Sequence, residues 1–426
     1  MLTTLKNAWK IPDLRRKILF TLGMLIIYRL GAAIPIPGIS SEALAELFKG
    51  QESGVLGLFD MMSGGSFSKM TIFALNIYPY VTASIIVQLL TIAIPRLEAL
   101  AKEGEAGRKK LAQFTRYGTV VFALIQAIGI TVGLFNQALL DNKFMTKFIA
   151  VVVLTAGTAF LMWLGEQITE NGIGNGISLI IFTGIVSRMP GDYLNMFKLW
   201  KAGTTSLVEI IIFLIVSIFI IAGVVAIQEG TRKIPVQYAK RMVGRKMYGG
   251  QNTHIPLKVL MAGVIPVIFS TSLLVFPQTI GMFFNPTGGF AQFVQKYLSQ
   301  SGSPGVWIYS ILNFLLIVLF TFFYTAIQFN PVEYANNLKQ YSGFIPGIRP
   351  GKPTADYLAR SLNRITLIGA FALGIIATIP TIIFSATTLR INFGGTALLI
   401  VVGVALETMR QIEAQMLTRH YKGFLS

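Results

Sequence analysis

The chain has 426 residues, of which 53% are hydrophobic and only 13% charged, and its formal net charge is +18 at pH 7. Soluble domains carry about 25% charged residues, so this composition excludes an ordinary soluble globular protein. The chain has no cysteine, and its two histidines lie far apart without the spacing of a zinc site, so disulfides, thiolate metal sites and thiol nucleophiles are excluded. We expect a membrane protein without a metal site or cofactor.

Apolar segments recur along the whole chain, which leaves no room for a separate soluble domain of any size. A spanning helix needs about 20 apolar residues, and a hydropathy window of that size finds ten segments. The first is expected to stay in the mature chain, because Pro35 and Pro37 follow it and no small-residue cleavage pattern is present. The fifth is the least typical, since it is short and glycine-rich. The ten expected spans lie near Ile18–Ile34, Ile72–Ile94, Leu111–Phe135, Phe148–Ile168, Gly176–Met189, Leu207–Ile227, Leu257–Ile280, Val306–Ile327, Ile365–Phe384 and Gly394–Gln411.

A half-length segment, Gly57–Lys69, lies between the first and second spans. It is too short to cross a bilayer, and it holds Asp60, three serines and several glycines, whose polar groups hydrocarbon does not satisfy. Irregular backbone at membrane depth is tolerated where it is buried in protein or lines a wet cavity. The segment therefore indicates a re-entrant element on a pathway across the membrane. The alternative is an external loop that happens to be apolar.

Basic residues alternate in density from one connection to the next. Lys and Arg gather in the N-terminal stretch, in the connections between spans two and three, six and seven, and eight and nine, and near the C-terminus. By the positive-inside rule these segments are cytoplasmic, and ten spans then place both termini on that side. The pI near 10 is thereby explained without nucleic acid as a specific ligand. We expect a multi-pass membrane protein.

The cytoplasmic connection 228–256 is too long to be a simple connector. Its Ile234, Val236 and Tyr238 alternate with other residues at the period of a strand, and Gly244 and Gly249 suit turns. We predict a hairpin that stands up into the cytoplasm.

The cytoplasmic connection 329–361 carries a second candidate docking element. Two prolines and two glycines bracket Arg349, so the loop is expected to have a stiff tip that presents one guanidinium, with few apolar residues to bury. The alternative for both loops is a topological signal or binding to anionic lipid headgroups. The docking candidates are Arg349, Lys352, Arg241, Arg245 and Lys246.

Other motifs exclude several activities. The Gly172–Gly176 run follows no predicted strand, so it indicates a tight turn and not a nucleotide loop. Arg29 and Glu407 stand out as charges inside spans; each is a functional candidate, or else lies near a span end and snorkels or pairs structurally. No chain of carboxylates or histidines is present to relay protons, and no constellation for intramembrane hydrolysis is present. The chain is therefore not expected to be an enzyme.

Several longer segments closely resemble the SecY family, the large subunits of the bacterial protein-conducting channel, and the resemblance covers essentially the whole chain. It implies an all-α polytopic protein with ten helices in two pseudo-symmetric halves, residues 1–190 and 207–411, around an hourglass pore, followed by a cytoplasmic tail, 412–426. The segments that carry it are Phe73–Gln88, Met162–Glu170, Gly172–Ser178, Pro256–Val259, Met261–Pro266, Phe329–Pro331, Ile345–Gly351 and Phe393–Thr396.

The resemblance implies a channel subunit in the bacterial plasma membrane that passes unfolded secretory polypeptides across the membrane and releases membrane helices sideways into lipid. The implied partners are SecE and SecG, the SecA ATPase motor, the ribosome, signal sequences and preproteins, and anionic lipids. The half-length segment matches the family's plug, a short helix in the external funnel of the idle channel. Its residues are Gly57, Leu58, Phe59, Asp60, Met61, Met62, Ser63, Gly64, Gly65, Ser66 and Phe67.

By motif, the resemblance also places a ring of aliphatic side chains at the narrowest point of the pore. Two of its pairs are spaced i,i+4, so each pair shares one helix face. Branched aliphatic side chains at a constriction exclude water and block ions, and they offer a passing polypeptide no fixed hydrogen bonds. Without the resemblance such faces would indicate core or lipid contact. The ring is expected to contain Ile77, Val81, Ile177, Ile181, Ile268 and Ile400.

A lateral exit is implied between spans two and three on one side and spans seven and eight on the other. Small and mildly polar side chains let two helix faces separate, although ordinary helix packing uses the same residue types. The candidates are Thr82, Gln88, Ser272 and Phe276.

The alternative function is a secondary transporter of a small solute, which also uses broken helices near the midplane. The missing ionisable cluster and the two elaborate cytoplasmic loops count against it. Copurification with SecE would distinguish the two.

Overall fold

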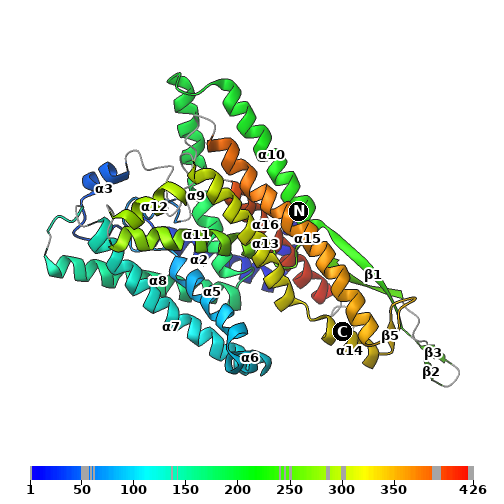
Figure 1. Cartoon of the computed structure of the whole chain (residues 1–426). Coiled ribbons are helices and arrows are strands. Elements are labelled where there is room, and N and C mark those ends of the chain that lie inside the picture. The colour runs from blue at the N-terminus through cyan, green and yellow to red at the C-terminus, as the bar shows by residue number, and fades with distance from the viewer. Residues whose placement is uncertain are drawn as a thin grey trace.

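The computed structural model describes residues 2–48, 57, 60, 63–135, 138–141, 143–238, 241–243, 246–248, 252–284, 288–298, 304–385 and 395–420. Within them the protein is a bundle of long helices with a small β-sheet at one end (Figure 1). Most long helices expose apolar side chains along one face, as helices that face hydrocarbon do.

The N-terminal part of the chain folds into helices that follow the expected spans. Pro12 starts α2 at the position where proline is best tolerated, and the side chain of Asn175 caps α9 by accepting from the Ser178 N–H. The helices are α1 (Leu2–Lys10), α2 (Pro12–Gly31), α3 (Ser41–Phe48), α5 (Tyr78–Ala93), α6 (Pro95–Lys102), α7 (Glu105–Gly129) with the π-helix η1 (Ile130–Leu134), α8 (Phe144–Asn171) and α9 (Gly176–Lys201).

The C-terminal part contains the remaining helices. A capping box between Ser206 and Glu209 fixes the start of α10. The helices are α10 (Leu207–Glu229), α11 (Ile265–Phe284), α12 (Gly289–Tyr297), α13 (Gly305–Gln328), α14 (Pro331–Gln340), α15 (Lys352–Ser385) and α16 (Gly395–His420).

Among the described residues, five helical segments are long and apolar enough to cross a membrane: α7 with η1, α8, α10, α13 with α14, and α15. Helices α5 and α6 meet the same criterion together but are bent by 100° at their junction. The other four expected spans coincide with α2, α9, α11 and α16, which are shorter or more highly charged.

Several expected spans differ from the structure at their ends. The second was expected to begin at Ile72, but residues 72–77 form turns, with Asn76 at a φ of 50°, and the helix begins at Tyr78. The seventh was expected to begin at Leu257. In the structure Leu257 belongs to a β-strand that pairs with an earlier strand of the same connection. The fifth was expected to end at Met189, but the helix continues through Pro190 to Lys201.

The predicted hairpin in the connection 228–256 is confirmed. Strand β1 (Thr231–Tyr238) pairs antiparallel with β4 (Asn252–Lys258), and β2 (Arg241–Val243) pairs with β3 (Lys246–Tyr248). Ile234 and Val236 are buried, as their alternation predicted. The sequence did not predict that β5 (Gly343–Phe344), from the other cytoplasmic loop, would pair with β1.

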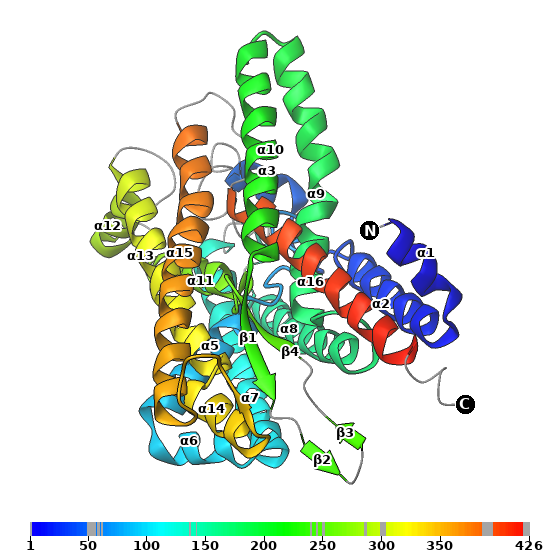
Figure 2. The ribbon, with the colours of Figure 1, turned by 90° about the vertical axis from the view of Figure 1, so that its right-hand side faces the viewer.

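Three connections that the charge pattern assigns to the cytoplasm, between spans two and three, six and seven, and eight and nine, lie at one end of the molecule. Figure 2 shows α6, the strands and α14 together, opposite the turn that joins α9 to α10. The main apolar core lies between these ends, and the two parts of the chain meet in it: α11 packs against α5, α7 and η1, and α16 packs against α9. A separate small cluster joins α16 to α1. The predicted division into pseudo-symmetric halves stays a prediction.

Candidate functional site

The six expected ring residues lie in one apolar cluster, contributed by α9, α11, α16 and the start of α5. The i,i+4 spacing places each pair on one helix face, and Gly165 on α8 leaves the space that the Cδ1 of Ile177 occupies. This cluster is also the main core of the bundle, so the ring itself stays a prediction. Ile77, Val81, Ile181, Ile268 and Ile400 are buried, and Ile177 is partly buried.

Most described residues of the expected plug are buried in the protein. Gly57 and Asp60 are helical, residues 63–70 form turns, and Ser63, Ser66 and Phe67 are at most 1% exposed. The ring of Phe67 packs against those of Phe48 and Phe135. Burial of this kind fits a segment lodged inside the protein and not an external loop. Leu58, Phe59, Met61 and Met62 lie outside the described residues.

Polar contacts attach the expected plug to two helices. Asp60 forms an ion pair with Arg188 on α9, and its Oδ1 accepts a hydrogen bond from the Ser68 backbone N–H at 2.7 Å. From α2, the Tyr28 hydroxyl donates to the Ser63 carbonyl and Arg29 Nη1 to the Gly64 carbonyl, each at 3.4 Å. Arg29 thus has a structural partner.

Sequence reasoning missed Arg188. It lies inside the fifth expected span, and a charge in an apolar span is the signal that would have identified it. Glu407, the other charge noted in a span, lines a polar cavity described below.

The lateral-exit candidates occupy α5 and α11, which contact each other. Gln88 on α5 accepts a hydrogen bond from the hydroxyl of Tyr324 on α13, so a polar bond crosses the expected seam. Thr82 donates within its helix to the Tyr78 carbonyl, and Phe276 is partly buried. The hydroxyl of Ser272 is buried without a hydrogen-bond partner among the described residues. Tyr324 was not predicted.

The docking candidates lie at the hairpin end of the molecule. Arg349 and Lys352 are exposed, and positive φ values at Gly347 and Gly351 form the turns on either side of Arg349. Arg241 and Lys246 belong to β2 and β3, whereas Arg245 lies outside the described residues.

The expectation that this loop has few apolar residues to bury is wrong. Phe329, Leu338 and Ile345 are buried with Ile234 and Val236 of β1 in a separate small core. The two loops therefore form one unit, which holds the Arg349 tip.

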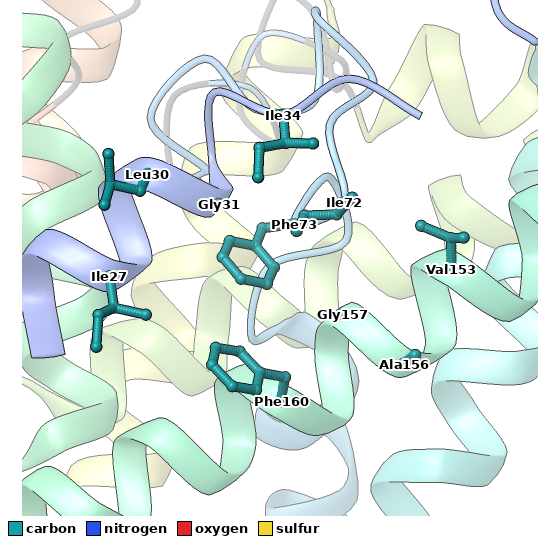
Figure 3. A pocket seen from close by; sticks show the side chains of 10 residues that line it. All are labelled: Ile27, Leu30, Gly31, Ile34, Ile72, Phe73, Val153, Ala156, Gly157 and Phe160. Carbon is teal, nitrogen blue, oxygen red and sulfur yellow. The ribbon is translucent and has the colours of Figure 1, made fainter. Parts of the chain in front are cut away.

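An apolar cavity of about 490 Å³ lies where the end of α2 meets α8 and the turns before α5 (Figure 3). The ring of Phe73 stacks between Tyr28 and Phe160, at centroid distances of 6.1 and 5.9 Å. These contacts explain how the non-helical residues before α5 are held. The labelled side chains are all hydrocarbon, so the cavity offers a polar ligand no side-chain hydrogen bond.

A second cavity, of about 330 Å³, is polar and lies near the sheet. Gln228, Lys258, Glu407 and Arg410 are among its lining residues. Arg410 joins α16 to the end of α10 by donating to the Gln228 carbonyl and, at 3.0 Å, to Glu229. No group of His, Asp and Glu that could hold a metal ion occurs among the described residues.

The Gly172–Gly176 run forms the tight turn that the sequence predicted, between α8 and α9. Its Ile173 and Gly174 backbone N–H groups donate, each at 3.0 Å, to Thr21 on α2 and to Gln411 on α16. The turn therefore connects helices from both parts of the chain.

Comparison with known proteins agrees with the family resemblance found in the sequence. The model of the SecY family matches residues 71–409. The chain is 48% identical to the protein translocase subunit SecY of Streptomyces scabiei over the full length of both proteins. The chain belongs to the SecY family. It is therefore a multi-pass membrane protein and a channel subunit, not an enzyme, and the solute-transporter alternative is wrong.

Solved structures share the fold at lower identity. A protein-conducting channel matches with a TM-score of 0.68 and 20% identity, covering 94% of this chain and 92% of that one. Sec61 in the canine ribosome–channel complex from the endoplasmic reticulum matches with a TM-score of 0.59 and 19% identity, at the same coverage. The helix order of this chain is thus that of a SecY-type channel.

Proposed function

We propose that this channel subunit carries unfolded secretory polypeptides across the membrane through a pore closed by the aliphatic ring and the plug. The main support is that aliphatic side chains from α5, α9, α11 and α16 lie in one cluster. Phe67 of the buried segment packs into the same cluster. A constriction lined in this way excludes water and ions when closed. It also yields to a polypeptide of any sequence, because it offers no fixed hydrogen bonds.

Apolar segments of the substrate leave sideways between α5 and α7 on one side and α11 and α13 on the other. The contact of α11 with α5 and α7 and the bond between Gln88 and Tyr324 support this location. Few polar bonds across a seam let it open and reclose. Among the described residues the Ser272 hydroxyl has no hydrogen-bond partner, so it adds no bond that opening would break.

The exposed basic residues at the hairpin end serve as the docking surface for a motor or a ribosome. The solved Sec61 complex contains a ribosome, and the curated relatives are translocase subunits. For this chain we extend the assignment to SecE, SecG, SecA and the ribosome, with anionic lipid around the basic segments. The charge pattern supports a cytoplasmic location for both termini and for the end of the molecule that holds α6, the strands and α14.

The seal is tested by single-channel conductance of the purified translocase complex in a planar bilayer. Deleting residues 57–67 is expected to give brief, ion-conducting openings and a relaxed demand for a good signal sequence, because the ring alone closes less tightly. Ile400→Asn is expected to act in the same direction, since a polar ring member lets water bridge the constriction.

Ile400→Leu keeps an aliphatic side chain at the same position and is the matched control. It is expected to remain as ion-tight as the parent. If the deletion and Ile400→Asn are also as tight and as selective as the parent, these residues serve only in packing and the proposed seal is wrong.

A further inference from the structure

Two charged side chains meet in the interior of the bundle. The Asp60 side chain is 7% exposed and that of Arg188 is 23% exposed, and Nη1 of Arg188 donates to Oδ2 of Asp60. Removing charges from water is costly, so each is tolerated in such a place chiefly because the other is present.

The same carboxylate also organises its own segment. Oδ1 of Asp60 accepts from the backbone N–H of Ser68, eight residues further on, and the Asp60 carbonyl accepts from the Gly65 N–H at 2.9 Å. One side chain therefore both folds the segment back on itself and attaches it to α9.

Close packing surrounds the ion pair. Gly64 has a φ of +67°, and a Cβ there would lie 2.9 Å from the Gly184 carbonyl oxygen and 2.9 Å from the Ser187 hydroxyl, both on α9. The segment thus packs directly against α9, at the helical turn just before Arg188. Any outward movement of the segment has to separate Asp60 from Arg188.

We propose that the Asp60–Arg188 ion pair is the latch that holds the plug in its closed position, a proposal that rests on the plug role of residues 57–67. Arg188 is a positioning residue: it acts on the pore through the plug. In the closed channel the pair is shielded from water, so separation leaves two poorly solvated charges. Once a polypeptide enters and water follows, both charges become hydrated and the cost of keeping them apart falls. The latch therefore resists spontaneous opening more than opening by a substrate.

The test is a double-mutant cycle on the complete translocase complex, read as the opening frequency of idle channels in a planar bilayer. Asp60→Asn removes the charge and keeps an oxygen for the Ser68 N–H. Arg188→Gln removes the other charge. Each is expected to raise the opening frequency by roughly tenfold or more, because the remaining charge is buried without a partner.

The double variant is expected to open no more often than the more severe single variant, because two groups that act as a pair are not additive. Arg188→Lys keeps the charge and is expected to stay near the parent. Lys198→Gln removes an exposed positive charge from the same helix, and no effect is expected. The purified yield and the thermal unfolding of each complex show whether folding is intact. If Arg188→Gln does not assemble, Asp60→Asn still tests the ion pair.

Either of two results overturns the latch: neutralised variants that open as rarely as the parent, or a double variant whose effect equals the product of the single effects. Deletion of residues 57–67 separates the two proposals. If the deletion opens the channel while the neutralised variants do not, the plug stands and the latch is wrong. If the deletion leaves the channel closed, the plug role itself fails.

Discussion

The hydrogen bond between Tyr324 and Gln88 gives a direct test of the lateral exit. Tyr324→Phe removes one hydroxyl and keeps the aromatic ring, which packs edge-on against Phe269 at a centroid distance of 5.1 Å. The change therefore removes the bond from α13 to α5 with little loss of packing.

The size of the effect follows from the two groups involved. A neutral hydrogen bond contributes about 1 kcal/mol net, and the Gln88 oxygen left without its partner adds a desolvation cost. We expect the closed state to lose about 1 to 2 kcal/mol, which raises the open population by a factor of about 5 to 30. A precursor with a weakened signal sequence has the most to gain from this shift, because a good signal sequence already opens the exit.

The assay compares transport of a precursor with an intact signal sequence and one with a weakened signal sequence into vesicles that contain the purified complex. Tyr324→Phe is expected to improve the weakened precursor selectively. Thr325→Val is the control, because the buried Thr325 hydroxyl donates to the Thr321 carbonyl of its own helix, at 2.7 Å, and has no bond to another helix among the described residues. If Tyr324→Phe transports the weakened precursor no better than Thr325→Val does, the bond does not hold the exit closed.

Three further predictions concern other parts of the molecule. Arg349→Glu should leave assembly intact and abolish motor-driven transport into vesicles, because the exposed guanidinium lies on a tip held by the loop core. A cysteine pair at Thr82 and Phe276 should crosslink and block translocation, which reduction of the disulfide should restore. Gly174→Ala should lower the melting temperature of the complex by an amount equivalent to about 1 to 3 kcal/mol, because Gly174 has a φ of +90° and a Cβ would lie 2.9 Å from Leu179.

Each of these predictions has its own contrary outcome. Normal transport by Arg349→Glu, or failure of that variant to accumulate, would show that the tip does not dock a motor. Free transport through a crosslinked channel would remove Thr82 and Phe276 from the exit. Gly191→Ala, in α9 with open space around the new methyl group, is the control for Gly174→Ala, and equal stability of the two variants would contradict the strain argument.

The sequence by itself determined the membrane class, the order of the spans and the family. Apolar segments of spanning length, the density of basic residues and the alternation at Ile234 and Val236 are local signals, and the helices and the hairpin followed them. Segments along the chain that match motifs of the SecY family then identified the family. Each of these inferences needs only residues that are near one another in sequence.

The tertiary structure decided which distant residues meet. Asp60 pairs with Arg188 across 128 residues, and Gln88 meets Tyr324 across 236, so no local pattern contains either contact. Hydropathy alone extends the second span to Ile72, but residues 72–77 form turns and the helix begins at Tyr78. In these turns Phe73 stacks between Tyr28 and Phe160. Hydropathy records the preference of each residue for hydrocarbon, whereas partners and helix ends are fixed by the free energy of packing and of satisfied polar groups in the assembled bundle.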